Sequence, residues 1–483
     1  MKLKATLVSA VLLAAWVTPS FAEVQNVKVG GDITVRAFHR SCLDLNCGDD
    51  SVDYSASANG VRSEEADDFL MSTVGINVGA DLTENVSAFI RIANERDWNV
   101  GTNGATNATG DLDLSQAYIT LKELFSSPLT LRLGQQPIVW GRGLVLGSNL
   151  LPGTIIGTDD RNGSITANEF TDFTAFDALR ATLDLGGAAG MPLMVDAVYI
   201  KGDENVTANS DDRNIMGINI GTKLDSANAE FETYFLNLRT KDTSFLSLLS
   251  RDANNADGSV STLGFRGSAA PVEGSYVYGE AAYQFGGRPA DIEASQPADD
   301  KLQAWMFNLG GEYTMTDVAM TPKLGAEWRY YSGKDTDGAL MGWQPIAPGY
   351  YRTALREFQT RSTVTGFYNN AQTGVTSAQT NQIEWALYGS LKPLEDLTVN
   401  QRLSWFYTPV GTLAPSSGGE SDREHSLGTE WDTVVSYNYT DDVQFGVIYG
   451  VFFPGNIYRV ASNGGINGDD IASELITTVG VKF

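Results

Sequence analysis

Residues 323–330 read KLGAEWRY, and charged and apolar side chains alternate along this stretch. Successive side chains of a β-strand point to opposite sides, so a strand here would have one charged face and one apolar face. The charged set is Lys323, Glu327 and Arg329, and the apolar set is Leu324, Ala326, Trp328 and Tyr330. The stretch therefore predicts a β-strand with two different environments on its two faces.

The same alternation recurs along most of the chain. Each segment is about 9 to 16 residues long, which is the length that a tilted strand needs to cross an outer membrane. Eighteen segments show it, at 27–39, 66–80, 85–97, 111–122, 128–136, 172–186, 192–203, 213–225, 228–240, 259–270, 274–286, 300–315, 318–333, 380–392, 397–409, 425–440, 443–453 and 472–483.

The connections between these segments alternate in length. Short turns follow the even-numbered segments, for example at 81–84, 225–227 and 440–442. Long polar stretches follow odd-numbered ones, among them 137–171 and 334–379. Membrane barrels combine short periplasmic turns with longer external loops. We therefore predict an all-β fold, a transmembrane antiparallel β-barrel of about 18 strands with short periplasmic turns and long extracellular loops.

The strand number decides which face points inward. Soluble barrels stay near about eight strands because their side chains must fill the interior. Eighteen strands leave a wider space, so the polar face lines the interior and the apolar face meets lipid. Closure of the barrel pairs every strand edge, as hydrocarbon requires.

The N-terminus predicts secretion. Lys2 and Lys4 precede the apolar residues 5–17, and a small-residue cleavage pattern ends at Ala22. We expect a signal peptide at 1–22 and a single barrel domain at 23–483 in the outer membrane of a Gram-negative cell. The final Phe483, with apolar residues at every second position before it, is similar to the C-terminal signature of outer-membrane barrels.

The charge of the chain limits its partners. The 483 residues include 33 lysines and arginines against 59 aspartates and glutamates, a formal net charge of −26. Binding of nucleic acid needs clustered basic residues, so we expect none. The expected partners are outer-membrane lipid, lipopolysaccharide reached through divalent cations, and a polar solute or saccharide. The oligomeric state is open, with a monomer favoured.

Two features of the loops predict covalent or ionic stabilisation. Cys42 and Cys47 lie close together in a polar stretch, so in an oxidising compartment we expect a disulfide between them. Residues 252–258 have the composition of a calcium-binding loop but lack the oxygen spacing of an EF-hand. We expect no other cofactor and no other metal.

Several short stretches resemble the alginate-export family of outer-membrane porins. They are 131–137 (LRLGQQP), 140–143 (WGRG), 176–180 (FDALR), 425–432 (HSLGTEWD) and 449–455 (YGVFFPG). The resemblance implies an eighteen-stranded barrel that passes a solute across the outer membrane. In the type member this solute is an anionic polysaccharide, drawn through an arginine-lined lumen.

Strand parity gives the candidate pore wall. The residues that we expect to line it are Arg36, Arg91, Arg132, Arg180, Arg329, Arg402, Glu327, Glu430 and Asp432. By the same parity, ten positive and ten negative residues point inward, so the wall is mixed rather than strongly basic. Every periplasmic turn is also short, whereas the type exporter has a long gating loop there. The resemblance therefore supports a pore better than it supports alginate.

Two long loops are candidates for a constriction or a mouth. Arg142 and Arg161 lie in 137–171, and Arg352 and Arg356 lie in 334–379 among aromatic residues. If either loop folds inward, its arginines become selectivity residues. The alternatives are an exposed lid for the first loop and a surface hairpin for the second.

The sequence also favours transport over catalysis. General acid–base catalysis most often uses histidine, and His39 and His425 are the only histidines in the chain. Neither lies in a nucleophile or metalloprotease motif. We therefore predict a passive channel (porin) for polar or anionic solutes, such as an oligo- or polysaccharide, and no enzyme. The alternative is a barrel that acts as a sheath or scaffold for a secretion or electron-conduit partner.

Overall fold

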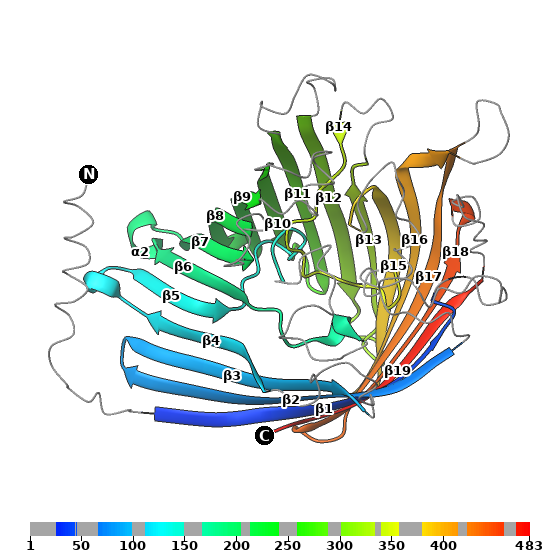
Figure 1. Cartoon of the computed structure of the whole chain (residues 1–483), viewed down its shortest axis with the longest axis horizontal. Coiled ribbons are helices and arrows are strands. Elements are labelled where there is room, and N and C mark those ends of the chain that lie inside the picture. Colours follow the sequence, from blue (N-terminus) through cyan, green and yellow to red (C-terminus); the bar gives the residue numbers. More distant parts are fainter. Residues whose placement is uncertain are drawn as a thin grey trace, which may run out of the picture.

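The computed structural model describes residues 26–43, 45, 66–98, 112–148, 167–203, 213–240, 258–287, 301–333, 340–356, 379–413, 423–457 and 470–483. These residues form a curved wall of strands (Figure 1). The first strands are β1 (Asn26–Ser41), β2 (Ala66–Thr83), β3 (Val86–Asp97), β4 (Asp113–Leu121), β5 (Leu129–Gln136), β6 (Phe176–Asp184), β7 (Leu193–Asp203), β8 (Arg213–Leu224) and β9 (Ala229–Thr240).

The remaining strands continue the wall in chain order. They are β10 (Gly258–Ala269), β11 (Ser275–Gly287), β12 (Lys301–Thr314), β13 (Lys323–Tyr331), β14 (Leu340–Met341), β15 (Gln382–Leu394), β16 (Leu397–Leu413), β17 (Arg423–Asn438), β18 (Val443–Pro454) and β19 (Ala472–Lys482). The short helices are η2 (Leu124–Ser126), η3 (Asn168–Phe170), α2 (Gly186–Ala189) and η4 (Asp225–Ala227). Among the described residues, none of the helices is both long enough and apolar enough to span a membrane.

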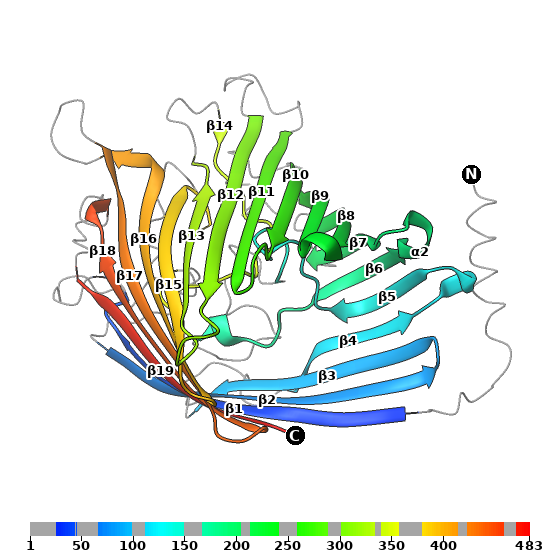
Figure 2. The ribbon, with the colours of Figure 1, turned by 180° about the vertical axis from the view of Figure 1, so that it is seen from behind.

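The wall closes on itself between its first and last strands. β19 pairs with β1 from Asp32 opposite Lys482 to Ser41 opposite Ser473, and Figure 2 shows these two strands side by side from behind. The two-residue β14 only adds a parallel bridge to β12, while β13 pairs directly with β15. Within the described residues the barrel is thus a closed ring of eighteen antiparallel strands, and the predicted fold is confirmed.

The connections also follow the predicted alternation. Residues 84–85, 395–396 and 439–442 join their strands by short turns, while residues 137–175 and 332–381 make long connections. Because consecutive strands are antiparallel, all of the short turns lie at one end of the barrel and all of the long connections at the other. We assign the end with the short turns to the periplasm.

One predicted strand was wrong at its start. Residues 318–322 are not part of β13 but form a turn, in which the amide of Met315 donates to the carbonyl of Pro322 at 2.8 Å. Pro322 has no N–H to donate to a strand ladder, and Met320 and Thr321 have positive φ angles of 67° and 43°. These features end the ladder before residue 323.

The two faces of the wall differ as the alternation predicts. On the outer face Leu324 is 60% exposed and Trp385 is 55% exposed, whereas on the inner face Glu327 is 4% and Arg329 is 1% exposed. Apolar side chains therefore cover the outside, where lipid would contact them. The low exposure of the inner side chains shows that other parts of the chain cover them.

The largest apolar cluster lies inside the barrel, near the end with the long connections. Ile200, Ile215 and Leu236 point inward from β7, β8 and β9, and they are fully buried together with Trp140 and Trp343 of the long connections. Burying one large apolar side chain contributes roughly 1.5–3 kcal/mol. The cluster therefore fixes parts of the long connections against the inner wall.

Candidate functional site

The first of these connections folds into the barrel after β5. Residues 137–148, here called the first inward segment, run along the inner faces of β7, β9 and β11. The indole Nε1 of Trp140 donates to Asp196 at 2.8 Å. The backbone amide of Gly141 donates to Glu232 at 3.0 Å, and that of Arg142 donates to Glu280 at 2.8 Å. Of the two alternatives for this loop, its described part takes the inward one.

The connection after β13 also folds inward. Residues 340–356, the second inward segment, reach from β11 to β17. The amides of Leu355 and Arg356 donate to Glu430 at 2.6 and 2.8 Å, and the amide of Ala354 donates to Asp432 at 3.1 Å. The described part of this loop is therefore not a surface hairpin.

The two inward segments are hydrogen-bonded to each other. The amide of Gly147 donates to the carbonyl of Ala347 at 2.7 Å, and the amide of Ala347 donates to Val145 at 3.0 Å. A third bond joins Gly349 to the carbonyl of Gly143 at 2.8 Å. A Cβ atom on Gly349 would lie 2.5 Å from the backbone of Gly147, so this close approach requires glycine. The two segments form one bridge inside the barrel.

A third stretch packs against the opposite part of the wall. Residues 167–175, the return segment, precede β6 and contact β1 and β3. The hydroxyl of Thr171 donates to Glu95 at 2.8 Å, and Arg91 forms an ion pair with Asp172 at 2.7 Å. Arg40 forms ion pairs with Glu169 of this segment and with Glu474 of β19. Three separate segments thus occupy the space inside the wall.

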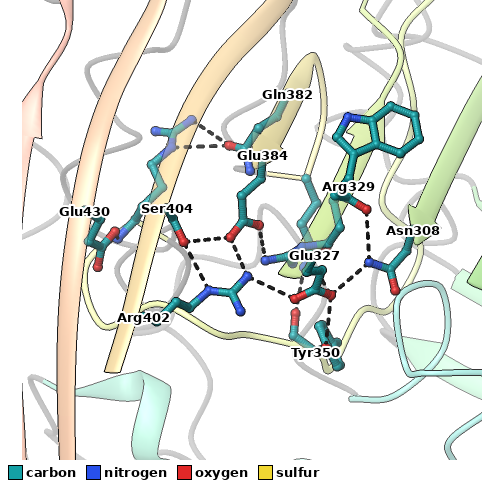
Figure 3. Close-up of polar contacts among 12 residues, drawn as sticks. Asn308, Glu327, Arg329, Tyr350, Gln382, Glu384, Arg402, Ser404 and Glu430 are labelled. Carbon is teal, nitrogen blue, oxygen red and sulfur yellow. Dashed lines mark hydrogen bonds and ion pairs between the residues drawn. The ribbon is translucent and has the colours of Figure 1, made fainter. Parts of the chain in front are cut away.

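A buried network of charges lies on β13, β15 and β16 (Figure 3). The guanidinium of Arg402 contacts Glu327 at 3.0 Å and Glu384 at 2.6 Å. Arg329 forms a further ion pair with Glu384, and Asn308 donates to Glu327 at 2.8 Å. Charges with this little exposure are stable only when they are paired and hydrogen-bonded.

Aromatic rings and arginines meet where the first inward segment crosses this network. The guanidinium of Arg142 lies 3.5 Å from the ring centroid of Tyr278 and 5.0 Å from that of Tyr350, and Arg352 lies 4.0 Å from the latter. Burial, followed by the charge of Glu327, raises the pKa of Tyr350. Its phenol therefore stays protonated and donates to Glu327 at 3.2 Å.

Two predicted wall arginines lie opposite each other on neighbouring strands. Arg132 of β5 pairs with Arg180 of β6 in the strand register. Arg180 is bonded to Asp196, with Nε at 2.9 Å and Nη2 at 2.8 Å. Arg132 contacts the ring of Tyr118 at 4.8 Å and the hydroxyl of Thr120 at 3.4 Å. Among the described residues, no carboxylate lies within ion-pair distance of Arg132.

The other predicted wall residues all lie on the inner face. Arg36 rests over the ring of Phe170 at 4.7 Å, and Arg91 is paired with Asp32 and Asp172. The remaining wall residues are buried beneath the inward segments or within the network; they are Arg329, Arg402, Glu327, Glu430 and Asp432. Arg356, which belongs to the second inward segment, is buried as well. That these residues line the path of a solute stays a prediction.

Several predictions fall partly outside the described residues. Arg161, Cys47 and residues 252–257 of the candidate calcium segment are among them. Cys42 is disulfide-bonded. Within the part of the chain that the structure describes, no cluster of His, Cys, Asp and Glu side chains could hold a metal ion.

The sequence interpretation missed three residues that hold the first inward segment: Trp140, Asp196 and Glu232. A signal for them exists in β7 to β9, where Ile200, Ile215 and Leu236 are apolar although their parity is inward. Inner positions that face water are expected to be polar. Apolar residues there indicate that another segment covers the wall.

Known proteins are similar to this chain only at low sequence identity. No curated protein matches the sequence. Acinetobacter baumannii OccAB4 aligns at a TM-score of 0.49 with 10% identity, covering 96% of this chain and 100% of that chain. Pseudomonas aeruginosa OccK11 (OpdR) aligns at a TM-score of 0.48 with 9% identity, covering 94% of this chain and 96% of that chain. The outer membrane channel DcaP of Acinetobacter baumannii aligns at a TM-score of 0.39 with 11% identity, covering 95% of this chain and 97% of that chain.

The sequence itself matches a family model. The model of the alginate export family matches residues 53–467, which span the barrel from before β2 to beyond β18. The match covers most of the chain, and it agrees with the closed barrel of eighteen strands that the described residues form. The chain is an outer-membrane β-barrel of the porin type and belongs to the alginate export family.

Proposed function

We propose that this protein is a passive channel in the outer membrane of a Gram-negative cell and that it favours anionic solutes over cationic ones. The observation that carries the proposal is Arg132, an inner-wall cation that faces Arg180 and has no carboxylate within ion-pair distance among the described residues. Like charges directly opposite each other on a sheet are destabilising. An anion near the pair would relieve this repulsion.

The inner carboxylates support the same preference, although the chain as a whole is acidic. Glu232, Glu280 and Glu430 accept hydrogen bonds from backbone amides of the inward segments. Asp196 is bonded to Arg180 and Trp140. Amide dipoles and paired cations offset the negative charge of these groups. An ion pair offsets its arginine as well as its carboxylate, so the balance is tipped by Glu280 and Glu430, which amides hold, and by Arg132.

Reversal potentials in planar bilayers test this preference. With a tenfold KCl gradient, the wild-type barrel should show discrete conductance and a reversal potential of anion-preferring sign. The Arg132→Gln variant should shift that potential toward cation preference. Arg239→Gln is the matched control, because Arg239 lies on the outer face of β9 and is exposed there. Equal potentials for wild type and Arg132→Gln would contradict the proposal.

The family supports an acidic saccharide such as alginate as the candidate solute. Arginines and aromatic rings, here Arg142, Arg352 and Tyr350, can bind carboxylates and the faces of sugar rings. Alginate oligosaccharides added to one side of the bilayer should block the current at lower concentrations than neutral oligosaccharides of equal length. Equal block by the acidic and the neutral oligosaccharides would contradict the preference for an acidic saccharide but not the proposal that the protein is a channel.

The inward segments weigh against the alternative of a sheath or scaffold. Residues 137–148, 167–175 and 340–356 occupy space inside the wall that a threaded partner would need. Co-purification of a stoichiometric partner from the native membrane, together with absence of current from the isolated barrel, would reverse this conclusion.

A further inference from the structure

Four inner-wall carboxylates hold the two inward segments by accepting hydrogen bonds from their backbone amides. Glu232 and Glu280 accept the consecutive amides of Gly141 and Arg142. Glu430 and Asp432 accept the three consecutive amides of residues 354–356. At Glu430 the consecutive amides of Leu355 and Arg356 converge on one carboxylate, and such an arrangement is strong and directional. Each segment is thus held by two carboxylates. The strands that carry the two pairs lie nearly a third of the barrel circumference apart.

Three of these four carboxylates are almost fully buried, whereas the side chain of Glu232 is 20% exposed and pairs with Arg266 at 2.6 Å. Glu280 is 2%, Glu430 is 0% and Asp432 is 3% exposed. A passing solute therefore has almost no access to Glu280, Glu430 and Asp432. Their contribution to the channel must act through the backbone groups that they hold rather than through direct contact.

Release of one segment would disturb the other. The bonds between Gly147 and Ala347 and between Gly349 and Gly143 join the two segments into one bridge. The bridge is also held at Trp140 by Asp196 and at Gln344 by Gln284. Since both segments lie inside the barrel, their docked position sets how much of the lumen stays open.

We infer that Glu232, Glu280, Glu430 and Asp432 are positioning residues, which fix the bridge against the wall and so set the conductance of the channel. The inference rests on the proposed channel function. It separates two roles for inner charges: these carboxylates determine the width of the passage, whereas Arg132 determines its preference for anions.

Two kinds of variant release the second inward segment by different means. Glu430→Ala with Asp432→Ala removes the acceptors of its three amides. Gly450→Val changes no charge, but a Cβ at Gly450 would lie 2.8 Å from the Cβ of Ala354 and push the segment away. Gly446→Val is the matched control on the same strand, since its Cβ would meet only Thr478 at 3.4 Å and the backbone oxygen of Val435 at 3.9 Å. Glu312→Ala controls for loss of an inner carboxylate that is paired with Lys323 instead of a segment.

Single-channel recordings in 1 M KCl test the inference. At this salt concentration the Debye length is only about 3 Å, so the inner charges have little direct effect on the current and the width of the passage dominates. Both releasing variants should raise the conductance at least roughly twofold, since a wider passage conducts more ions. Both controls should keep the wild-type conductance. Heat-modifiable mobility in gels confirms that each barrel is assembled, and Gly450→Val decides the question if the double variant does not assemble.

The outcomes distinguish this inference from the function on which it rests. Wild-type current that neither releasing variant changes would overturn the positioning role and leave the channel intact. A rise that Glu312→Ala or Gly446→Val reproduces would overturn it too, because the effect would not depend on the segment. A wild-type barrel that carries no current would overturn both the channel and the positioning role.

Discussion

Arg132 and Arg180 lie directly opposite each other on the inner faces of β5 and β6. Asp196 of β7 accepts from Nε and Nη2 of Arg180 and also accepts the indole N–H of Trp140. One carboxylate therefore balances one of two facing cations and at the same time anchors the first inward segment. A substitution at Asp196 can therefore remove its negative charge and keep a hydrogen-bond acceptor for Trp140.

Asp196→Asn should increase the preference for anions. The amide oxygen can still accept from Trp140, so the segment stays anchored, while the loss of one negative charge leaves both arginines uncompensated. The reversal potential in a KCl gradient should shift in the direction opposite to that of Arg132→Gln. Asp184→Asn, at the exposed end of β6, serves as the control. A shift toward cations would show that Asp196 does not act through Arg180.

The anion preference should weaken as salt increases. The Debye length falls from about 10 Å at 0.1 M to about 3 Å at 1 M ionic strength, so the field of the inner arginines reaches less of the passage. Permeability ratios measured at a fixed tenfold gradient and at increasing mean KCl concentration should approach that of free solution. A ratio that does not depend on salt would indicate selection by size rather than by charge.

The positions of the strands could be predicted because their signal is local. The alternation in KLGAEWRY places Glu327 and Arg329 on one face, and the structure has both on the inner wall. Strand ends were less predictable. The irregular turn at 318–322 depends on Pro322 and on two left-handed residues, and the alternation alone extends the strand through it.

The docking of the loops could not be predicted from local patterns. That Glu430 accepts the amides of Leu355 and Arg356 depends on a contact between residues about 75 positions apart. Parity places Glu430 inside the barrel but does not say whether water or protein faces it. Only the apolar inner positions, such as Ile215 and Leu236, indicate in sequence that part of the wall is covered.

Removal of Arg402 should destabilise the barrel strongly. Arg402→Leu leaves Glu327 and Glu384 in a buried site with one compensating cation fewer, and breaking a buried ion pair costs about 3–5 kcal/mol. Urea unfolding in detergent micelles, followed by tryptophan fluorescence, measures this loss. Combining Arg402→Leu with Glu384→Gln should recover part of the loss, because the second change removes one unpaired charge. A loss in free energy of unfolding below about 1 kcal/mol, typical of an exposed pair, would show that the network is hydrated.

The seam between β1 and β19 should be sensitive to side-chain size at Gly31. The amide of Gly31 donates to the carbonyl of Phe483 at 2.8 Å, and the amide of Phe483 donates back at 3.0 Å. A Cβ on Gly31 would lie 2.5 Å from the carbonyl oxygen of Gly75 and 2.8 Å from the ring of Phe483. Gly31→Val should therefore disturb the pairing of β1 with β2 and displace Phe483, which loosens the seam, and an open edge is costly in hydrocarbon. The folded fraction in heat-modifiability gels should fall well below that of Gly79→Val, since a Cβ at Gly79 would meet only Phe89 at 4.0 Å. Equal folded fractions for the two variants would mean that closure tolerates a wider seam than the hydrogen bonds of Phe483 imply.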